Sequence, residues 1–177
     1  MIYLLLTDGF EEIEAFTPVD ILRRCGAELS TVGVHGKTVM GAHNIKTEAD
    51  IAILEINKAA MEMLILPGGP GYAGLKTPEV YDLVNYAVEN NIPVGAICAA
   101  PSVLGEMGLL ENKKATCFPG FENEMKGAVL TGEGVAEDGI FVTGKGAGAA
   151  SEFAFALASR ICGKEKASEI RNAMQYR

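Results

Sequence analysis

Short apolar runs alternate with longer segments of mixed polarity along this chain of 177 residues. The runs 62–66 and 93–97 are almost continuously apolar, as expected for strands that have helices on both faces. The alternation predicts an α/β sandwich built around a mainly parallel sheet. The expected strands are 2–7, 28–34, 62–66, 93–97, 113–117, 128–131 and 140–143. The expected helices are 12–25, 77–90, 100–108, 147–162 and 164–174.

The segment 34–48 departs from this alternation. Gly36, Gly41 and Asn44 divide it into short strand-like pieces, which predicts a surface hairpin. A chain of this length forms one domain with a substantial core, and no repeat, low-complexity tract or linker divides it. We therefore expect a single domain over residues 1–177.

Composition argues against several classes of function. No apolar run approaches the roughly 20 residues needed to cross a bilayer, although 49% of the residues are hydrophobic. The formal net charge of −8 opposes binding to nucleic acid and to anionic membranes. The four cysteines lack the spacing of a zinc site or a disulfide scaffold, and the first residues lack a signal-peptide pattern. We expect a cytoplasmic protein without a bound metal.

Cys98 stands at a junction typical of a nucleophile elbow. The apolar run 93–97 ends there, two small residues follow, and a helix-compatible stretch begins at Pro101. A thiol at the start of a helix has its pKa lowered by the helix dipole, which predicts an unusually acidic thiol. The alternative for a free cysteine is an inert packing role. That role is the interpretation for the other cysteines, Cys25, Cys117 and Cys162, with Cys117 near enough in the chain to lie beside Cys98.

Two further segments are expected beside Cys98, because the carboxyl ends of parallel strands meet at one edge of a sheet. The loop 67–71, Pro-Gly-Gly-Pro-Gly, either presents unobstructed N–H groups to a developing oxyanion or forms a simple tight turn. In the segment 8–16, Glu14 lies among apolar neighbours. A carboxyl group in such surroundings has a raised pKa and can transfer a proton near neutral pH.

Two further motifs resemble nucleotide-binding sites, but each lacks a residue that such a site requires. Gly69, Gly71 and Gly74 match a dinucleotide fingerprint, but the next strand ends in Cys98 rather than in a ribose-binding acid. The run Gly139 to Lys145 resembles a phosphate-binding loop, but Gly146 stands where a hydroxyl should hold magnesium. We therefore expect no cofactor. His35 and His43 are the only histidines and both precede Cys98, so a later histidine base of the protease type is absent.

Taken together, these motifs resemble the DJ-one/ThiJ/PfpI family, and in particular its DJ-one/ThiJ branch. The resemblance covers nearly the whole chain. It is carried by Asp8-Gly9-Phe10-Glu11-Glu12-Ile13-Glu14, the stretch 18–26, Leu66-Pro67-Gly68-Gly69, Ala96-Ile97-Cys98-Ala99-Ala100-Pro101, and Gly146-Ala147-Gly148 before Glu152-Phe153-Ala154.

The resemblance implies a flavodoxin-like three-layer fold, a homodimer and a defined site. Cys98 would be the reactive thiol and Glu14 the carboxyl group bonded to it. The anion pocket would be formed by the backbone of Gly69 and Ala99, with Gly68 beside them. Accessory positions are Arg24, His43, Cys117 and Phe118.

The implied activity is cofactor-free glyoxalase or deglycase chemistry on small aldehydes such as methylglyoxal or on glycated adducts. A redox sensor or chaperone that uses oxidation of Cys98 is the alternative, and an intracellular peptidase is a weaker one. Peptidase members carry a histidine where this chain has Ala99, and some relatives carry one at the position of Phe118. A family arginine matches His43 here, and the family's Gly-Pro-Gly near the C-terminus is Gly-Ala-Gly.

Overall fold

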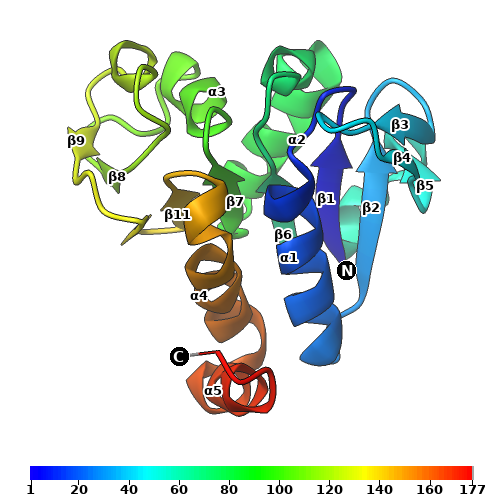
Figure 1. The fold of residues 1–177 in the computed structure, drawn as a ribbon. Coiled ribbons are helices and arrows are strands. Elements are labelled where there is room, and N and C mark those ends of the chain that lie inside the picture. The colour runs from blue at the N-terminus through cyan, green and yellow to red at the C-terminus, as the bar shows by residue number, and fades with distance from the viewer. Residues whose placement is uncertain (177) are drawn as a thin grey trace.

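A seven-stranded sheet forms the middle layer of the computed structural model, which describes residues 1–176 (Figure 1). The strand order is β10-β11-β7-β6-β1-β2-β5, and only the edge strand β10 runs antiparallel to its neighbour. The strands of this sheet are β1 (Ile2–Leu6), β2 (Leu29–Gly33), β5 (Ile51–Ala52), β6 (Met63–Leu66), β7 (Val94–Ile97), β10 (Val135–Asp138) and β11 (Phe141–Gly144).

Helices cover both faces of the sheet, so the flavodoxin-like three-layer prediction is confirmed (Figure 1). The first layer contains α1 (Glu12–Arg24), α4 (Ala150–Cys162) and α5 (Lys164–Ala173). The second contains α2 (Pro78–Glu89) and α3 (Pro101–Glu106). Alternate residues of β1 enter the two cores, with Leu4 on the α1 side and Leu5 on the α2 side. Short 3-10 turns lie at Ile53–Glu55, Lys58–Ala60, Tyr72–Leu75, Glu122–Glu124 and Ala147–Ala149.

The predicted hairpin is present as β3 (Thr38–Met40) and β4 (Lys46–Glu48). The expected strands 113–117 and 128–131 exist only in part, as β8 (Lys114–Ala115) and β9 (Val129–Leu130), and they pair with each other instead of joining the central sheet. The prediction omitted β5 and β10. β5 has two residues, and β10 is a polar edge strand without an apolar run.

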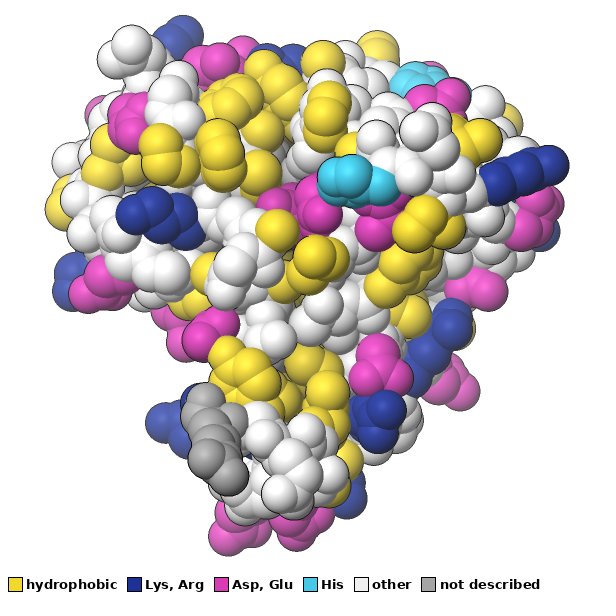
Figure 2. All heavy atoms as spheres, viewed as in Figure 1, with side chains coloured by type: hydrophobic (Ala, Val, Ile, Leu, Met, Phe, Trp, Pro, Cys, Tyr) yellow, Lys and Arg dark blue, Asp and Glu magenta, His cyan; other side chains and the backbone are white. Residues whose placement is uncertain are grey.

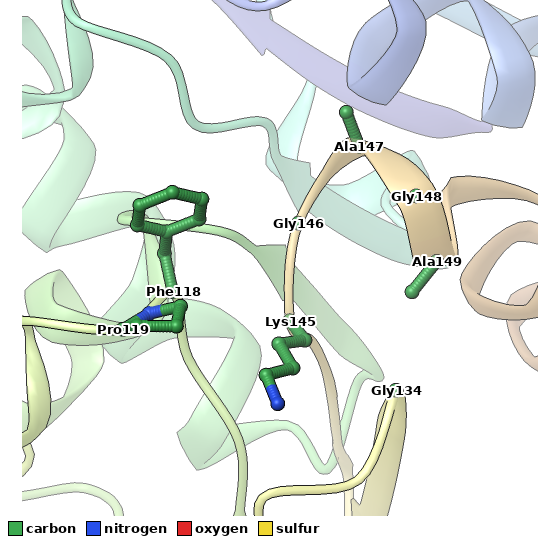
Figure 3. A pocket seen from close by; sticks show the side chains of 8 residues that line it. All are labelled: Phe118, Pro119, Gly134, Lys145, Gly146, Ala147, Gly148 and Ala149. Carbon is green, nitrogen blue, oxygen red and sulfur yellow. The ribbon is translucent and has the colours of Figure 1, made fainter.

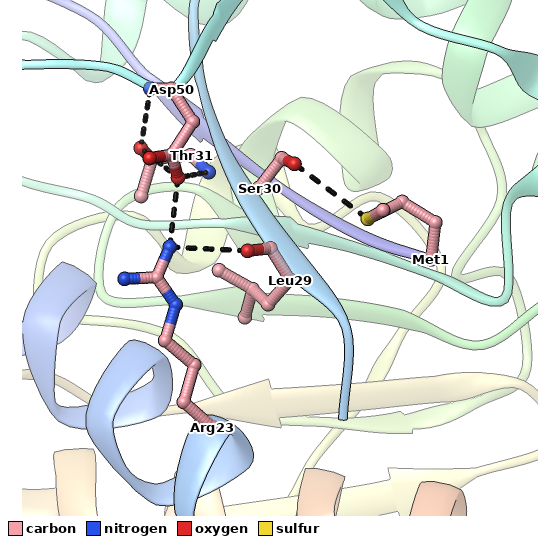
Figure 4. Close-up of polar contacts among 6 residues, drawn as sticks. All are labelled: Met1, Arg23, Leu29, Ser30, Thr31 and Asp50. Atoms are coloured by element: carbon pink, nitrogen blue, oxygen red, sulfur yellow. Dashed lines mark hydrogen bonds and ion pairs between the residues drawn. The ribbon is translucent and has the colours of Figure 1, made fainter. Parts of the chain in front are cut away.

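A polar cluster fixes the far end of α1 against β2 (Figure 4). Asp50 accepts hydrogen bonds from the backbone N–H and hydroxyl of Thr31 at 2.8 and 2.9 Å, and from the Arg23 guanidinium at 2.8 Å. Burial raises the pKa of Asp50, but the bonds from Thr31 and Arg23 outweigh it and bring the pKa below its usual value. This anchoring orients α1, whose opposite end carries Glu14.

The surface mixes charge with apolar patches, and the face in Figure 2 shows acidic and basic groups distributed among them. Ile13, Met40, Ile45 and Phe118 are large apolar residues that remain exposed. None of the helices within residues 1–176 combines the length and hydrophobicity needed to cross a membrane.

Candidate active site

The three segments expected to converge do meet at the carboxyl edge of the sheet. The loop after β1 and the loop after β6 are joined by backbone hydrogen bonds, from Glu11 to the carbonyl of Gly68 at 3.0 Å and from Gly71 to the carbonyl of Gly9 at 3.0 Å. The side chain of Glu14 then reaches from α1 across this junction to the turn that follows β7.

Cys98 lies on a strained turn between β7 and α3. Its φ of 66° lies in the left-handed region. Residues other than glycine rarely adopt this conformation, because their Cβ comes close to the following carbonyl oxygen. The turn is held by hydrogen bonds from Cys98 N–H to the Gly144 carbonyl and from Phe118 N–H to the Cys98 carbonyl, both 2.8 Å. Strain of this kind persists when surrounding structure enforces it, and it exposes the side chain at the end of the strand. The predicted elbow is therefore present.

Glu14 is buried with one of its oxygens unpaired. It is 1% exposed, its Oε2 accepts a hydrogen bond from Gly68 N–H at 3.0 Å, and its Oε1 has no partner in the described part of the chain. Burial raises the pKa of this carboxyl to about 7, although the contacts with Cys98 and with Gly68 N–H lower it. A buried carboxyl with an unsatisfied oxygen and a pKa near neutrality is suited to moving protons.

The Cys98 thiol is not acidic while Glu14 is ionised. Burial, the negative charge of Glu14 and the hydrogen bond between them raise the pKa of Cys98 to about 12, although the N–H groups of Gly69 and Ala99 lower it. The prediction of an unusually acidic thiol is wrong for this state. The helix that was expected to lower the pKa, α3, has only six residues.

The two groups therefore titrate as a pair. When the proton lies on Glu14, the negative charge that opposes ionisation of Cys98 is gone and the carboxylic acid can donate to the sulfur. Protonation of Glu14 therefore removes the negative charge that raises the pKa of Cys98, although burial still raises it. The pKa of about 7 at Glu14 makes its protonated form accessible near neutral pH.

Two of the three residues expected to form an anion pocket have backbone N–H groups beside the Cys98 sulfur. The N–H groups of Gly69 and Ala99 point to the Cys98 sulfur, where they favour negative charge. The N–H of Gly68 donates to Glu14 instead, so the structure does not place it with the N–H groups of Gly69 and Ala99. Gly68 has a different role, since a Cβ there would lie 2.7 Å from Cβ of Cys98 and 2.9 Å from Oε2 of Glu14.

We expect Gly68→Ala to disrupt the arrangement of Cys98 and Glu14, because the added methyl group would lie too close to both side chains and must displace one of them. The free energy of unfolding should fall by about 1–3 kcal/mol, and any activity that depends on Cys98 should fall with it. Gly148→Ala is the matched control: an added Cβ there meets nothing within 4 Å, so stability should change by less than about 0.5 kcal/mol. Chemical denaturation of both variants measures the difference, and equal stabilities would contradict the assigned role of Gly68.

The accessory positions are only partly brought to the site. His43 lies at its edge, where its N–H and Nδ1 each contact the buried Glu12 carboxylate at 2.7 Å. This carboxylate raises the pKa of His43. Cys117 is buried next to Phe118, whereas Arg24 lies at the far end of α1 and pairs with Asp20 at 2.7 Å. The structure therefore does not bring Arg24 to the site.

One group of side chains among residues 1–176 has ligand atoms close enough together to share a metal ion. Glu11, Glu12 and His43 place such atoms within 4.8 Å of one another. Glu11 already caps α1 by accepting from Glu14 N–H at 2.8 Å, and Glu12 is bonded to His43. Protein partners thus occupy these donors.

An open pocket of about 410 Å³ adjoins the elbow (Figure 3). Phe118 and Pro119 form one wall and the loop 146–149 forms another, with Lys145 between them. The pocket is tied to the reactive pair at two points, through the bond from Phe118 N–H to the Cys98 carbonyl and through Ala147, whose N–H is directed to Glu14. Lys145 was not predicted to line a pocket beside Cys98, because the run Gly139 to Lys145 resembles a phosphate-binding loop.

Known proteins share this arrangement of the whole chain. A DJ-1 superfamily protein of Salmonella typhimurium is 31% identical, with a TM-score of 0.94 over 99% of this chain and 98% of its own. The DJ-1beta structure of Drosophila melanogaster is 28% identical, with a TM-score of 0.92 over 98% of this chain and 96% of its own.

Curated relatives include proteins named for carbonyl chemistry. A Caenorhabditis elegans protein named glutathione-independent glyoxalase DJR-1.2 is 29% identical over 94% of this chain and 91% of its own. The DJ-1 homolog B of Arabidopsis thaliana is 32% identical over 95% of this chain. The chain spans 39% of the length of that plant protein and 45% of the length of the DJ-1 homolog A from the same plant. The model of the DJ-1/PfpI family matches residues 1–160, so the chain belongs to the DJ-1/PfpI family.

Proposed function

We propose that this protein is a cofactor-free enzyme that converts small reactive aldehydes, methylglyoxal foremost, into hydroxy acids at Cys98. The observation that carries the proposal is the pair of half-buried Cys98 and buried Glu14, which has an unpaired carboxyl oxygen and two backbone donors directed to the sulfur. Relatives named as a glyoxalase and a deglycase support the same class of substrate.

The reaction starts when the proton of the pair lies on Glu14. The Cys98 thiolate attacks the aldehyde carbon, and the N–H groups of Gly69 and Ala99 stabilise the oxyanion that forms. Glu14 protonates that oxygen, which completes a hemithioacetal, and is left ionised to act as a base.

Glu14 then transfers a proton between the two substrate carbons. It removes the hydrogen of the former aldehyde carbon, giving an enediolate, and returns a proton to the neighbouring carbon. Transfer of the remaining hydroxyl proton produces a thioester of lactate on Cys98. One water molecule hydrolyses the thioester, so methylglyoxal and water yield lactic acid and the thiol is regenerated. These reaction steps need neither glutathione nor a metal.

The test is lactate formation from methylglyoxal by purified protein without added thiol. We expect turnover of methylglyoxal but no cleavage of casein or fluorogenic peptides, because an amine leaving group requires a proton donor of the histidine type. The positions expected to supply that histidine hold Ala99 and Phe118. Peptide cleavage that survives purification and disappears in Cys98→Ala would contradict this assignment.

Oxidation sensing by Cys98 is the second candidate function. It is favoured by the same pair, because a protonated Glu14 can donate a hydrogen bond to a sulfinate. The Toxoplasma gondii structure described as oxidized DJ-1 is 28% identical, with a TM-score of 0.93 over 99% of this chain and 97% of its own.

We expect mild peroxide to convert Cys98 to sulfinic acid before any other cysteine acquires that modification. The pair with Glu14 gives Cys98 access to a thiolate, and a thiolate is the form that peroxide attacks. Peptide mass spectrometry after graded exposure measures the order. Sulfinate at Cys25 or Cys162 ahead of Cys98 would show that the reactive site is misassigned.

The resemblance also supports a cytoplasmic homodimer. Ile13 on α1 and Met40 and Ile45 around the hairpin are exposed apolar residues beside the site, and a second copy could cover them.

A further inference from the structure

Cys25 and Cys162 lie at the same end of two neighbouring helices. Helices α1 and α4 pack side by side on one face of the sheet (Figure 1), and each has 13 residues. Both begin at the carboxyl edge of the sheet, where Glu14 of α1 meets the turn at Ala147 that leads into α4. Helices of equal length that start together and run together also end together, about 20 Å further on.

Each helix ends in a cysteine followed by glycine. Cys25 caps α1 before Gly26, and Cys162 is the last residue of α4 before Gly163. Both thiols are half-buried and pack against the same apolar core. The Cys162 thiol donates to the Ala158 carbonyl at 2.9 Å, and burial together with the neighbouring Cys162 thiol raises the pKa of Cys25 to about 12.

We propose that Cys25 and Cys162 are a redox-active dithiol that a two-electron oxidant closes into an intramolecular disulfide between α1 and α4. With hydrogen peroxide, both S–H bonds and the O–O bond break, one S–S bond forms, and two electrons and two protons leave the sulfurs to reduce the peroxide to two molecules of water. The first sulfur is oxidised to a sulfenic acid; the second sulfur then attacks it, the S–O bond breaks, and the hydroxyl group leaves with the thiol proton as water.

The pair is distinct from the reactive site. Glu14 lies about 16 Å of helix away from Cys25, so the cross-link forms at the opposite end of α1. Little thiolate exists at Cys25 at neutral pH, since its pKa is raised, and closure is therefore slow unless oxidant persists or the pH rises. The resulting bond fixes α1 to α4 across a long chain segment, which constrains the unfolded state.

The test uses the Cys98→Ala/Cys117→Ala variant, in which Cys25 and Cys162 are the only thiols. Diamide, whose N=N bond accepts the two electrons and two protons, is added to dilute folded protein at mildly alkaline pH. We expect a mass loss of about 2 Da, loss of both free thiols and reversal by dithiothreitol. The unfolding temperature of the oxidised monomer should rise by several degrees.

Matched controls separate this cross-link from other oxidation. The same variant with Cys25→Ser should keep its single thiol and its mass, and peptide mapping of oxidised wild type should find the peptides of Cys25 and Cys162 joined. Two persistent thiols in each folded chain, or cross-links only between separate chains, would overturn the proposal. A disulfide that lowers the unfolding temperature would also overturn the proposal, because it would show that the folded chain must distort to bring the two sulfurs together.

Discussion

Cys98→Ala is expected to reduce lactate formation from methylglyoxal by at least about 10³-fold, the scale on which loss of a covalent nucleophile acts. The sulfur is the only group at the elbow that can bond to the aldehyde carbon, and it is the target of the N–H groups of Gly69 and Ala99. Steady-state rates with enzymatic detection of lactate measure the effect.

Cys117→Ala is the matched control for this substitution. Cys117 is a buried cysteine near the elbow, and its neighbour Phe118 is bonded to the Cys98 carbonyl, so its removal tests for nonspecific damage. We expect this variant to keep lactate formation within a few-fold of wild type once it is folded. Equal rates in Cys98→Ala and wild type would exclude covalent chemistry at the elbow.

Glu14→Gln is expected to reduce turnover by about 10²–10⁴-fold, because the amide keeps the shape of the carboxyl but cannot carry a proton. The pair of Cys98 and Glu14 loses the first of its two protons near the raised pKa of Glu14, about 7, and the singly protonated pair is the form from which the reaction starts. The wild-type rate should therefore rise with pH through this value. The variant should lose this limb of the pH profile. A wild-type rate in Glu14→Gln would contradict the acid–base role.

The free energy of unfolding should fall over the pH range in which the rate rises. The Glu14 carboxyl binds a proton more tightly in the folded chain than in the unfolded chain, where its pKa is near 4.5, so the folded state loses stability as pH rises from about 4.5 to about 7. The full difference corresponds to roughly 3 kcal/mol, and Glu14→Gln removes this penalty. We therefore expect the variant to be at least as stable as wild type at pH 8 by urea denaturation. Lower stability at pH 8 would mean that the amide itself disturbs the site.

The pairing of Cys98 with Glu14 was predictable because both residues lie in strong local patterns. Cys98 follows a continuous apolar strand and precedes a helix, and Glu14 lies in the first turn of a helix after β1. The convergence of their loops follows from the parallel sheet alone. The same local patterns predicted the central strands and the hairpin 34–48.

Features that depend on distant residues were not predictable. The pKa of Cys98 was expected to fall because of its helix, but the outcome is set by burial and by Glu14, which lies on another element. Gly68 was expected to bind an oxyanion, yet its N–H binds Glu14. The influence of Cys162 on the pKa of Cys25 depends on two helices of equal length that are far apart in the sequence. β10 forms a strand because it pairs with β11.

A bond between the Cys98 sulfur and the aldehyde carbon is the central step of the proposed reaction. Glu14→Gln should stall the reaction after this bond forms, so stoichiometric methylglyoxal labelled with ¹³C at the aldehyde carbon can be followed by NMR on this variant. The account predicts a hemithioacetal carbon signal that is absent when Cys98→Ala is added to Glu14→Gln. The same signal in both proteins, or none in either, would contradict it.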